Sequence, residues 1–130
     1  MMIDSSAVLA IVFQEPEARR MATAIVGSRE RYMSTVNWLE TLMVAEGKYG
    51  EASGDEALLI LEQLEIVPVP FDAKQMHEAR EAWRKFGKGR HPAALNMGDC
   101  CAYAAALEKG QPLLFKGEDF SKTDLEATPW

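Results

Sequence analysis

Apolar and polar residues alternate along this chain with two different periods, and each period predicts a different kind of element. Four short, mainly apolar runs, which begin or end next to charged residues or prolines, predict strands over 1–4, 32–34, 66–69 and 112–115. Apolar residues three and four positions apart predict helices over 7–13, 16–27, 36–49, 54–64, 72–86 and 95–110. Helices that alternate with short strands predict an α/β sandwich with a mainly parallel sheet.

The stretch 95–110, LNMGDCCAYAAALEKG, predicts a helix that is buried on most of its surface. No residue from 100 to 107 is charged, and Gly110 is a suitable stop. Asp99 falls at the N-terminal end, where unpaired N–H groups and the helix dipole favour an ionised carboxylate. That position suits an acid that holds a cation and also an acid that only caps the helix.

Three further acids have comparable positions. Asp4 ends the first strand, Asp119 follows the last one, and Glu40 lies in the expected first turn of helix 36–49. A parallel sheet brings such positions to one edge, where ligands bind in open α/β folds. Carboxylates gathered there repel one another unless a cation intervenes, and hard oxygen ligands suit Mg²⁺ or Mn²⁺. The simpler alternative for each acid is a helix cap or a solvated surface charge.

Composition indicates one compact unit. The chain has 130 residues, of which 48% are hydrophobic, so we expect a single domain over 1–130. No apolar run reaches membrane-spanning length, and the start lacks the pattern of a signal peptide. The adjacent cysteines, Cys100 and Cys101, are typical of helix packing in a reducing compartment. We therefore expect a cytoplasmic protein with no membrane association.

Charge restricts how the chain binds nucleic acid. The net charge of −6 argues against binding by bulk electrostatics, but not against a nuclease whose acids hold cations. The single dense basic segment is RKFGKGRHP, at 84–92, and its two glycines predict a flexible loop. It is either a solvated charge run or a loop that contacts phosphate beside the acids, through Arg84, Lys85, Lys88 and Arg90.

Several common kinds of site are missing from the sequence. There is no Gly-rich phosphate loop of the P-loop or dinucleotide type, no Cys/His zinc spacing and no convincing Ser-His-Asp set. The chain contains two histidines, which leaves most zinc and general-base schemes without residues to use.

Four motifs in this order resemble the PIN-domain family, and within it the VapC-type toxins of bacterial toxin–antitoxin pairs. They are MIDSSAVLAIVFQEPEA, STVNWLET, GKGRHPAALNMGDCCAYAAA and LLFKGEDFSKTDL, and together they extend over nearly the whole chain. The resemblance implies a three-layer α/β/α sandwich whose mainly parallel central sheet has about four to five short strands. It also implies a metal-dependent endoribonuclease that hydrolyses RNA phosphodiesters.

The resemblance assigns the four acids to one site. By motif, the catalytic and metal-binding positions are Asp4 in MIDSS, Glu40 in NWLE, Asp99 in NMGD and Asp119 in KGEDF. Asp4 and Asp99 would be the primary Mg²⁺ ligands, with Mn²⁺ as a substitute, and Glu40 and Asp119 would complete the site.

Three polar residues accompany these acids in the motifs. Thr35 and Asn37 are expected to form hydrogen bonds within the site, beside the second acid. Asp124 follows the fourth motif and could assist, below the rank of the four.

The resemblance further implies a VapB-type antitoxin that covers the acidic groove, and a homodimer. Three alternatives stay open at this stage. The chain could be a non-catalytic PIN-fold binding module, a phosphatase that forms an aspartyl-phosphate, or a structural domain in which every acid is a cap. The phosphatase is disfavoured because Ser5 and Ser6, rather than a second acid, follow Asp4.

Overall fold

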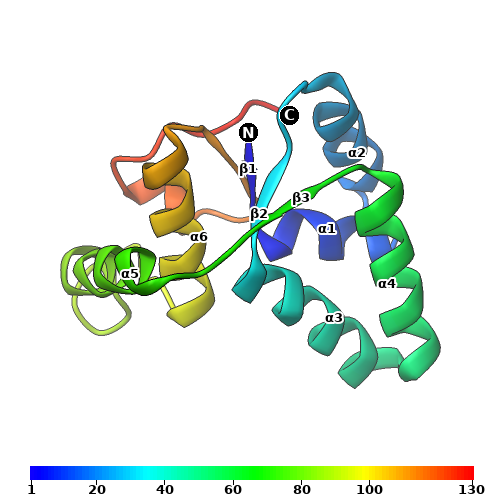
Figure 1. Cartoon of the computed structure of the whole chain (residues 1–130), viewed down its shortest axis with the longest axis horizontal. Coiled ribbons are helices and arrows are strands. Elements are labelled where there is room, and N and C mark those ends of the chain that lie inside the picture. The colour runs from blue at the N-terminus through cyan, green and yellow to red at the C-terminus, as the bar shows by residue number, and fades with distance from the viewer.

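The computed structural model describes residues 1–130 as a parallel sheet between two layers of helices (Figure 1). The strands are β1 (Met2–Ile3), β2 (Tyr32–Ser34), β3 (Val67–Val69) and β4 (Leu113–Leu114). The helices are α1 (Ser5–Val12), α2 (Ala18–Gly27), α3 (Thr35–Tyr49), α4 (Glu51–Gln63), α5 (Ala73–Phe86) and α6 (Met97–Lys109), followed by a 3₁₀ turn, η1 (Phe120–Lys122). The expected α/β/α sandwich with four short strands is confirmed.

The sheet has the order β3-β2-β1-β4, and every pair of neighbours is parallel. Pro68 lies in β3 at the edge of the sheet, where its missing N–H breaks no inner ladder. Strand β3 is therefore an edge strand, whereas β1 lies inside the sheet with a neighbour on each side.

Alternate side chains of the strands enter two separate cores. Met2 and Leu113 pack with α5 and α6, whereas Ile3 and Leu114 pack with the layer formed by α1 to α4. Figure 1 shows α5 and α6 on one side of the sheet and the other four helices on the opposite side. Since successive side chains of a strand point to opposite faces, even a two-residue strand joins both cores.

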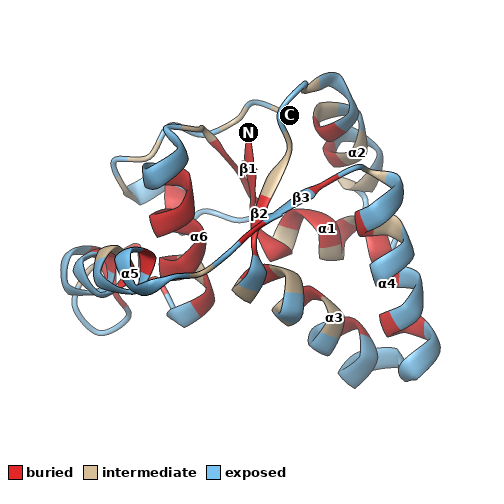
Figure 2. Ribbon diagram, viewed as in Figure 1, coloured by how far each residue is buried: buried red, intermediate tan, exposed pale blue.

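Helix α6 is buried on most of its surface, as its uncharged sequence predicts (Figure 2). Gly110 ends it in the left-handed conformation, with φ 60°. None of the six α-helices combines the length and the apolar character needed to cross a bilayer.

Several expected boundaries differ from the structure. Helix α1 begins at Ser5, ahead of the expected start at residue 7, because Asp4 is its N-cap. Helix α4 begins at Glu51, ahead of the expected start at residue 54, and therefore contains Gly54. A side chain at Gly54 would collide with the side chain of Glu46 on α3, so this glycine permits close contact between the two helices.

One further expectation needs correction. Glu40 lies beyond the first turn of α3, because this helix already begins at Thr35. The tail of the chain adds no strand to the sheet, and it forms a single parallel bridge between Ala127 and Leu113.

Candidate active site

The carboxyl ends of β1 and β2 and the N-terminal end of α6 meet at one edge of the sheet. Asp4 directly follows β1 and is only 3% exposed. Its Oδ2 accepts a hydrogen bond of 3.0 Å from the backbone N–H of Ser6, which caps α1. Asp4 therefore serves as a helix cap and as the innermost carboxylate of the candidate site.

Asn37 connects the three elements at this edge. Its Nδ2 donates to Oδ1 of Asp4 at 3.4 Å, to Oε2 of Glu40 at 3.5 Å and to the carbonyl oxygen of Gly98 at 3.0 Å. Its side chain is fully buried, and Oδ1 has no hydrogen-bond partner. The predicted role of Asn37 within the site agrees with these contacts, and its orphaned oxygen is a free acceptor inside the site.

Asp99 also combines two roles. Its Oδ2 accepts from the backbone N–H of Asn96 at 2.9 Å, while Oδ1 of Asn96 accepts from the N–H of Asp99 at the same distance. This capping box fixes the start of α6. The capping interpretation and the site interpretation of Asp99 are therefore both compatible with the structure.

Burial and mutual repulsion raise the pKa values of three of the acids. Burial is the largest cause for Asp4, whose pKa is raised further by the charge of Asp119. Burial and the charge of Asp4 raise the pKa of Glu40. The pKa of Asp99 rises to about 7, through burial first and then through the charges of Asp4, Asp119 and Glu40. The structure thus brings all four predicted acids within electrostatic reach of one another.

The donor set fits a hard divalent cation. Lys116 follows β4, but it pairs with Glu15 at 2.5 Å and Glu17 at 3.2 Å, and it does not neutralise the four acids. Carboxylate and amide oxygens are ligands that Mg²⁺ and Mn²⁺ prefer. No three His, Cys, Asp or Glu side chains form a ready-made metal cluster, since local hydrogen bonds hold Asp4 and Asp99 in place. Binding would require these side chains to converge.

Two polar residues predicted near the acids have other contacts. Thr35 is exposed, and its Oγ1 accepts from the backbone N–H of Phe71 at 3.1 Å, which ties α3 to the segment before α5. Asp124 binds Tyr103 and Lys85 through its two oxygens. Neither residue forms a hydrogen bond to the four acids, so the predicted hydrogen bonding of Thr35 within the site is absent.

The PIN-domain family model matches residues 1–126. The chain belongs to this family. Among its relatives, the protein named Ribonuclease VapC of Mycolicibacterium smegmatis is 48% identical over 127 residues, covering 98% of each chain. Ribonuclease VapC30 of Mycobacterium tuberculosis is 47% identical over 125 residues, covering 96% of this chain and 95% of its own.

Solved structures share the fold of this PIN domain. Mycobacterium tuberculosis VapC20, described as a sarcin–ricin loop cleaving toxin, has a TM-score of 0.79 at 18% identity and covers 98% of each chain. A toxin–antitoxin complex from Klebsiella pneumoniae has a TM-score of 0.72 at 15% identity, with 99% of this chain and 97% of that one covered. At such identities the likeness supports the fold alone.

The side chains of the basic segment in this PIN domain make more contacts than its sequence predicts. Arg84 and Lys85 belong to α5, where they pair with Glu81 at 2.8 Å and Asp124 at 2.6 Å. The guanidinium of Arg90 lies 4.1 Å from the ring centroid of Trp83. The segment 87–95 is closed by a backbone bridge between its two end residues. Of the four cations, only Lys88 has neither an acidic nor an aromatic partner in the structure.

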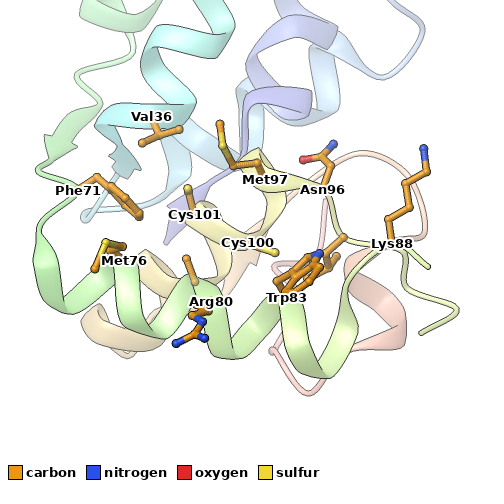
Figure 3. A pocket seen from close by; sticks show the side chains of 12 residues that line it. Val36, Phe71, Met76, Arg80, Trp83, Lys88, Asn96, Met97, Cys100 and Cys101 are labelled. Atoms are coloured by element: carbon orange, nitrogen blue, oxygen red, sulfur yellow. The ribbon is translucent and has the colours of Figure 1, made fainter. Parts of the chain in front are cut away.

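Beside the acids lies an apolar groove between α5, α6 and the start of α3, with a volume of about 520 Å³ (Figure 3). Trp83 and Met76 form its α5 side, and Cys100 and Cys101 form its α6 side. Its charged lining residues are Arg80 and Lys88, with no acid among them.

The groove is continuous with the candidate site. A second hollow, which Glu40 and Gly98 line, shares Val36, Asn96 and Met97 with it. The groove was not identified from the sequence, because the apolar spacing served only to predict helix 72–86. Met76 and Trp83 of that helix are 49% and 42% exposed in the structure. The sequence signal for the groove was Met97, a large apolar residue next to a glycine in the first turn of α6. Its side chain is exposed in the structure.

Proposed function

We propose that this PIN domain, taken as one domain over residues 1–130, is a VapC-type endoribonuclease that uses a divalent cation, Mg²⁺ or Mn²⁺, to hydrolyse RNA phosphodiesters. The observation that carries the proposal is the meeting of Asp4, Glu40, Asp99 and Asp119 at one sheet edge without a neutralising cation. Burial and the charges of neighbouring acids raise the pKa values of Asp4, Glu40 and Asp99 there. Relatives that are nearly half identical over almost the whole chain bear the name ribonuclease.

The four acids would hold the cation, with Asp4 and Asp99 as the principal ligands and Glu40 and Asp119 completing the site. When bound, such an ion orients the phosphate and stabilises the negative charge that develops on it. Asn37 orients Asp4 and Glu40 through the hydrogen bonds of one amide group. Asp99, whose pKa is about 7, would give up its proton as the cation binds.

The apolar groove offers a path for the substrate next to the acids. Its charged lining is cationic, and Lys88 and Arg90 lie near it on the basic segment. We assign these two residues the main part in guiding the RNA backbone. Arg84 and Lys85, which carry acidic partners, would contribute less.

A VapB-type antitoxin is the expected protein partner. Structures similar to this fold include a complex titled VapBC2 of Rickettsia felis, with a TM-score of 0.75 and 11% identity, which covers 97% of this chain and 94% of that one. An antitoxin with an Arg or Lys aimed at the unneutralised carboxylates would gain charge-assisted hydrogen bonds. A homodimer is also expected, because large apolar side chains such as Leu39, Met43 and Met97 are more than half exposed.

The deciding experiment is cleavage of a mixed RNA pool by the antitoxin-free chain with Mg²⁺, with Mn²⁺ and with a chelator. Asp99→Asn tests the site, and Asp55→Asn, at an exposed acid on α4, is the matched control. We expect cleavage that requires both the metal and Asp99, and that Asp55→Asn leaves unchanged. No cleavage by folded, metal-loaded protein on a pool that includes structured RNAs would favour a non-catalytic binding module instead.

A further inference from the structure

The segment 116–126 carries Asp119, the most exposed of the four acids, on a loop whose hydrogen bonds are mainly internal. The N–H groups of Ser121, Lys122 and Thr123 donate to carbonyl groups one turn earlier, at residues 118–120. Phe120 anchors the loop in the core, with its ring centroid 5.1 Å from that of Phe115. These contacts hold the base of the loop against the core that it shares with α6, and a polar contact with α6 comes from a later residue of the loop.

Asp124 supplies the polar connection between this loop and the helices. Its Oδ1 accepts from the hydroxyl of Tyr103 on α6 at 2.6 Å, and its Oδ2 pairs with Nζ of Lys85 on α5 at 2.6 Å. Between Gly117 and Leu125, these are the hydrogen bonds that reach beyond the loop. We refer to Lys85, Tyr103 and Asp124 as the Asp124 clamp.

The clamp and the candidate site share one helix face. Tyr103 follows Asp99 by four residues on α6, a spacing that puts both side chains on the same side of a helix. Asp119, five residues before Asp124, lies close enough to Asp99 and Asp4 for its charge to act on both. Helix α6 therefore carries Asp99 directly and holds Asp119 indirectly, through Tyr103.

We propose that the Asp124 clamp positions Asp119 against Asp99, so that Tyr103 and Asp124 are positioning residues of the candidate metal site. The inference rests on the proposed function, in which Asp119 helps to hold the cation. It also gives Asp124 a role other than that of a ligand, because both of its oxygens are engaged. Hydrogen bonds from Lys85 and Tyr103 hold the pKa of Asp124 below its ordinary value, so these contacts favour the ionised carboxylate.

The test is calorimetric titration of the intact, antitoxin-free chain with Mn²⁺. Tyr103→Phe removes the hydroxyl and keeps the ring in the core, and Asp124→Asn removes the charge. Outer-shell partners of metal ligands typically change affinity by roughly 10-fold to 100-fold, so we expect both variants to bind Mn²⁺ at least about tenfold more weakly. Tyr32→Phe is the matched control, since its hydroxyl donates to Glu30 at 3.1 Å at the amino end of β2.

A coupling experiment separates positioning from a general structural role. If the clamp acts through Asp119, the double variant Tyr103→Phe/Asp119→Asn binds Mn²⁺ as Asp119→Asn alone does. Losses that multiply in the double variant would overturn the inference, as would unchanged affinity in Tyr103→Phe and Asp124→Asn.

The experiments distinguish a failure of the clamp proposal from a failure of the proposed function. Clamp-dependent Mn²⁺ binding by a chain that cleaves no RNA would support the clamp and overturn the nuclease. If the chain cleaves RNA and the clamp variants bind Mn²⁺ as tightly as the unchanged chain, the nuclease is supported and the clamp is overturned. A chain that binds no Mn²⁺ would overturn both.

Discussion

The carboxylate of Glu40 packs directly against Gly98, in the space that any larger residue at position 98 would fill. A Cβ atom there would lie 3.0 Å from Cδ of Glu40 and still closer to its Oε2. The absence of a side chain at the first turn of α6 therefore lets Glu40 reach the other acids.

Gly98→Ala is accordingly expected to displace Glu40 while leaving the fold intact, because the obstacle is the flexible end of a side chain. We expect RNA cleavage to fall by roughly 10-fold to 100-fold, as for other disturbed outer parts of metal sites. Cleavage rates and melting curves of the variant would show this. Gly27→Ala is the control, since nothing lies within 4 Å of the added methyl group. Equal activity of the two variants would show that Glu40 is dispensable.

The raised pKa of Asp99 predicts how the stability of the metal-free chain depends on pH. The folded state binds this proton up to a pKa of about 7, whereas the unfolded state releases it near 3.8. Folding therefore favours proton uptake in this window, and the contribution of Asp99 to stability falls as pH rises from about 4 to 7.

Asp99→Asn should thus stabilise the chelator-treated protein at pH 8 by roughly 1 kcal/mol, a figure reduced for solvent screening, and should have little effect near pH 4. The asparagine keeps an oxygen that accepts from Asn96. Denaturant titrations at both pH values, with chelator and then with excess Mg²⁺, provide the measurement. A variant that is less stable than the wild-type chain at pH 8 with chelator would contradict the prediction.

The cationic residues of the basic segment are expected to contribute unequally to RNA binding. Lys88→Gln and Arg90→Gln should each weaken RNA binding and reduce the slope of log affinity against log salt by about 0.7, the value for one contact to single-stranded phosphate. Arg84→Gln, whose side chain pairs with Glu81, should change the slope little. Binding of a non-cleavable RNA at several salt concentrations would distinguish them. An unaltered slope in the Lys88 and Arg90 variants would remove these residues from the RNA path.

Ala94, which precedes the capping box of α6, has a positive φ of 52°. This conformation costs a non-glycine residue roughly 1–2 kcal/mol, whereas glycine has a larger entropy loss of roughly 0.5–1 kcal/mol. Ala94→Gly is therefore expected to raise the free energy of unfolding by about 0.5 kcal/mol. Ala93→Gly, at a fully buried neighbour, should lower it. Chemical denaturation of both variants would verify the opposite signs.

Local sequence signals were sufficient for most of the fold. Strands 32–34 and 66–69 and the helix with Asp99 near its start were predicted closely, because apolar period and capping act over a few residues. The start of α1 was misplaced because Asp4, Ser5 and Ser6 are all good N-caps, and only the structure shows which one accepts the hydrogen bond.

The candidate site was harder to predict from local sequence patterns than the fold was. The resemblance to a known family selected the four acids, whereas their helix positions alone were equally suited to capping. Contacts that hold the site together span large sequence distances, as between Asn37 and Gly98 or between Lys85 and Asp124. No local pattern encodes such pairs, so the acidic partner of Lys85 was not predicted. The resemblance placed Thr35 in the site, although its hydroxyl accepts a hydrogen bond from Phe71 instead.

The register of β1 also determines the order in which this fold can form during synthesis. Met2 pairs with Tyr32 on one side and with Leu113 on the other, so β1 gains its second neighbour only after β4 has been synthesised. Until then, one edge of β1 stays unpaired and exposed to pairing with other chains. Because Asp4 depends on β1 for its place, the acidic edge is expected to assemble only once β4 has joined the sheet.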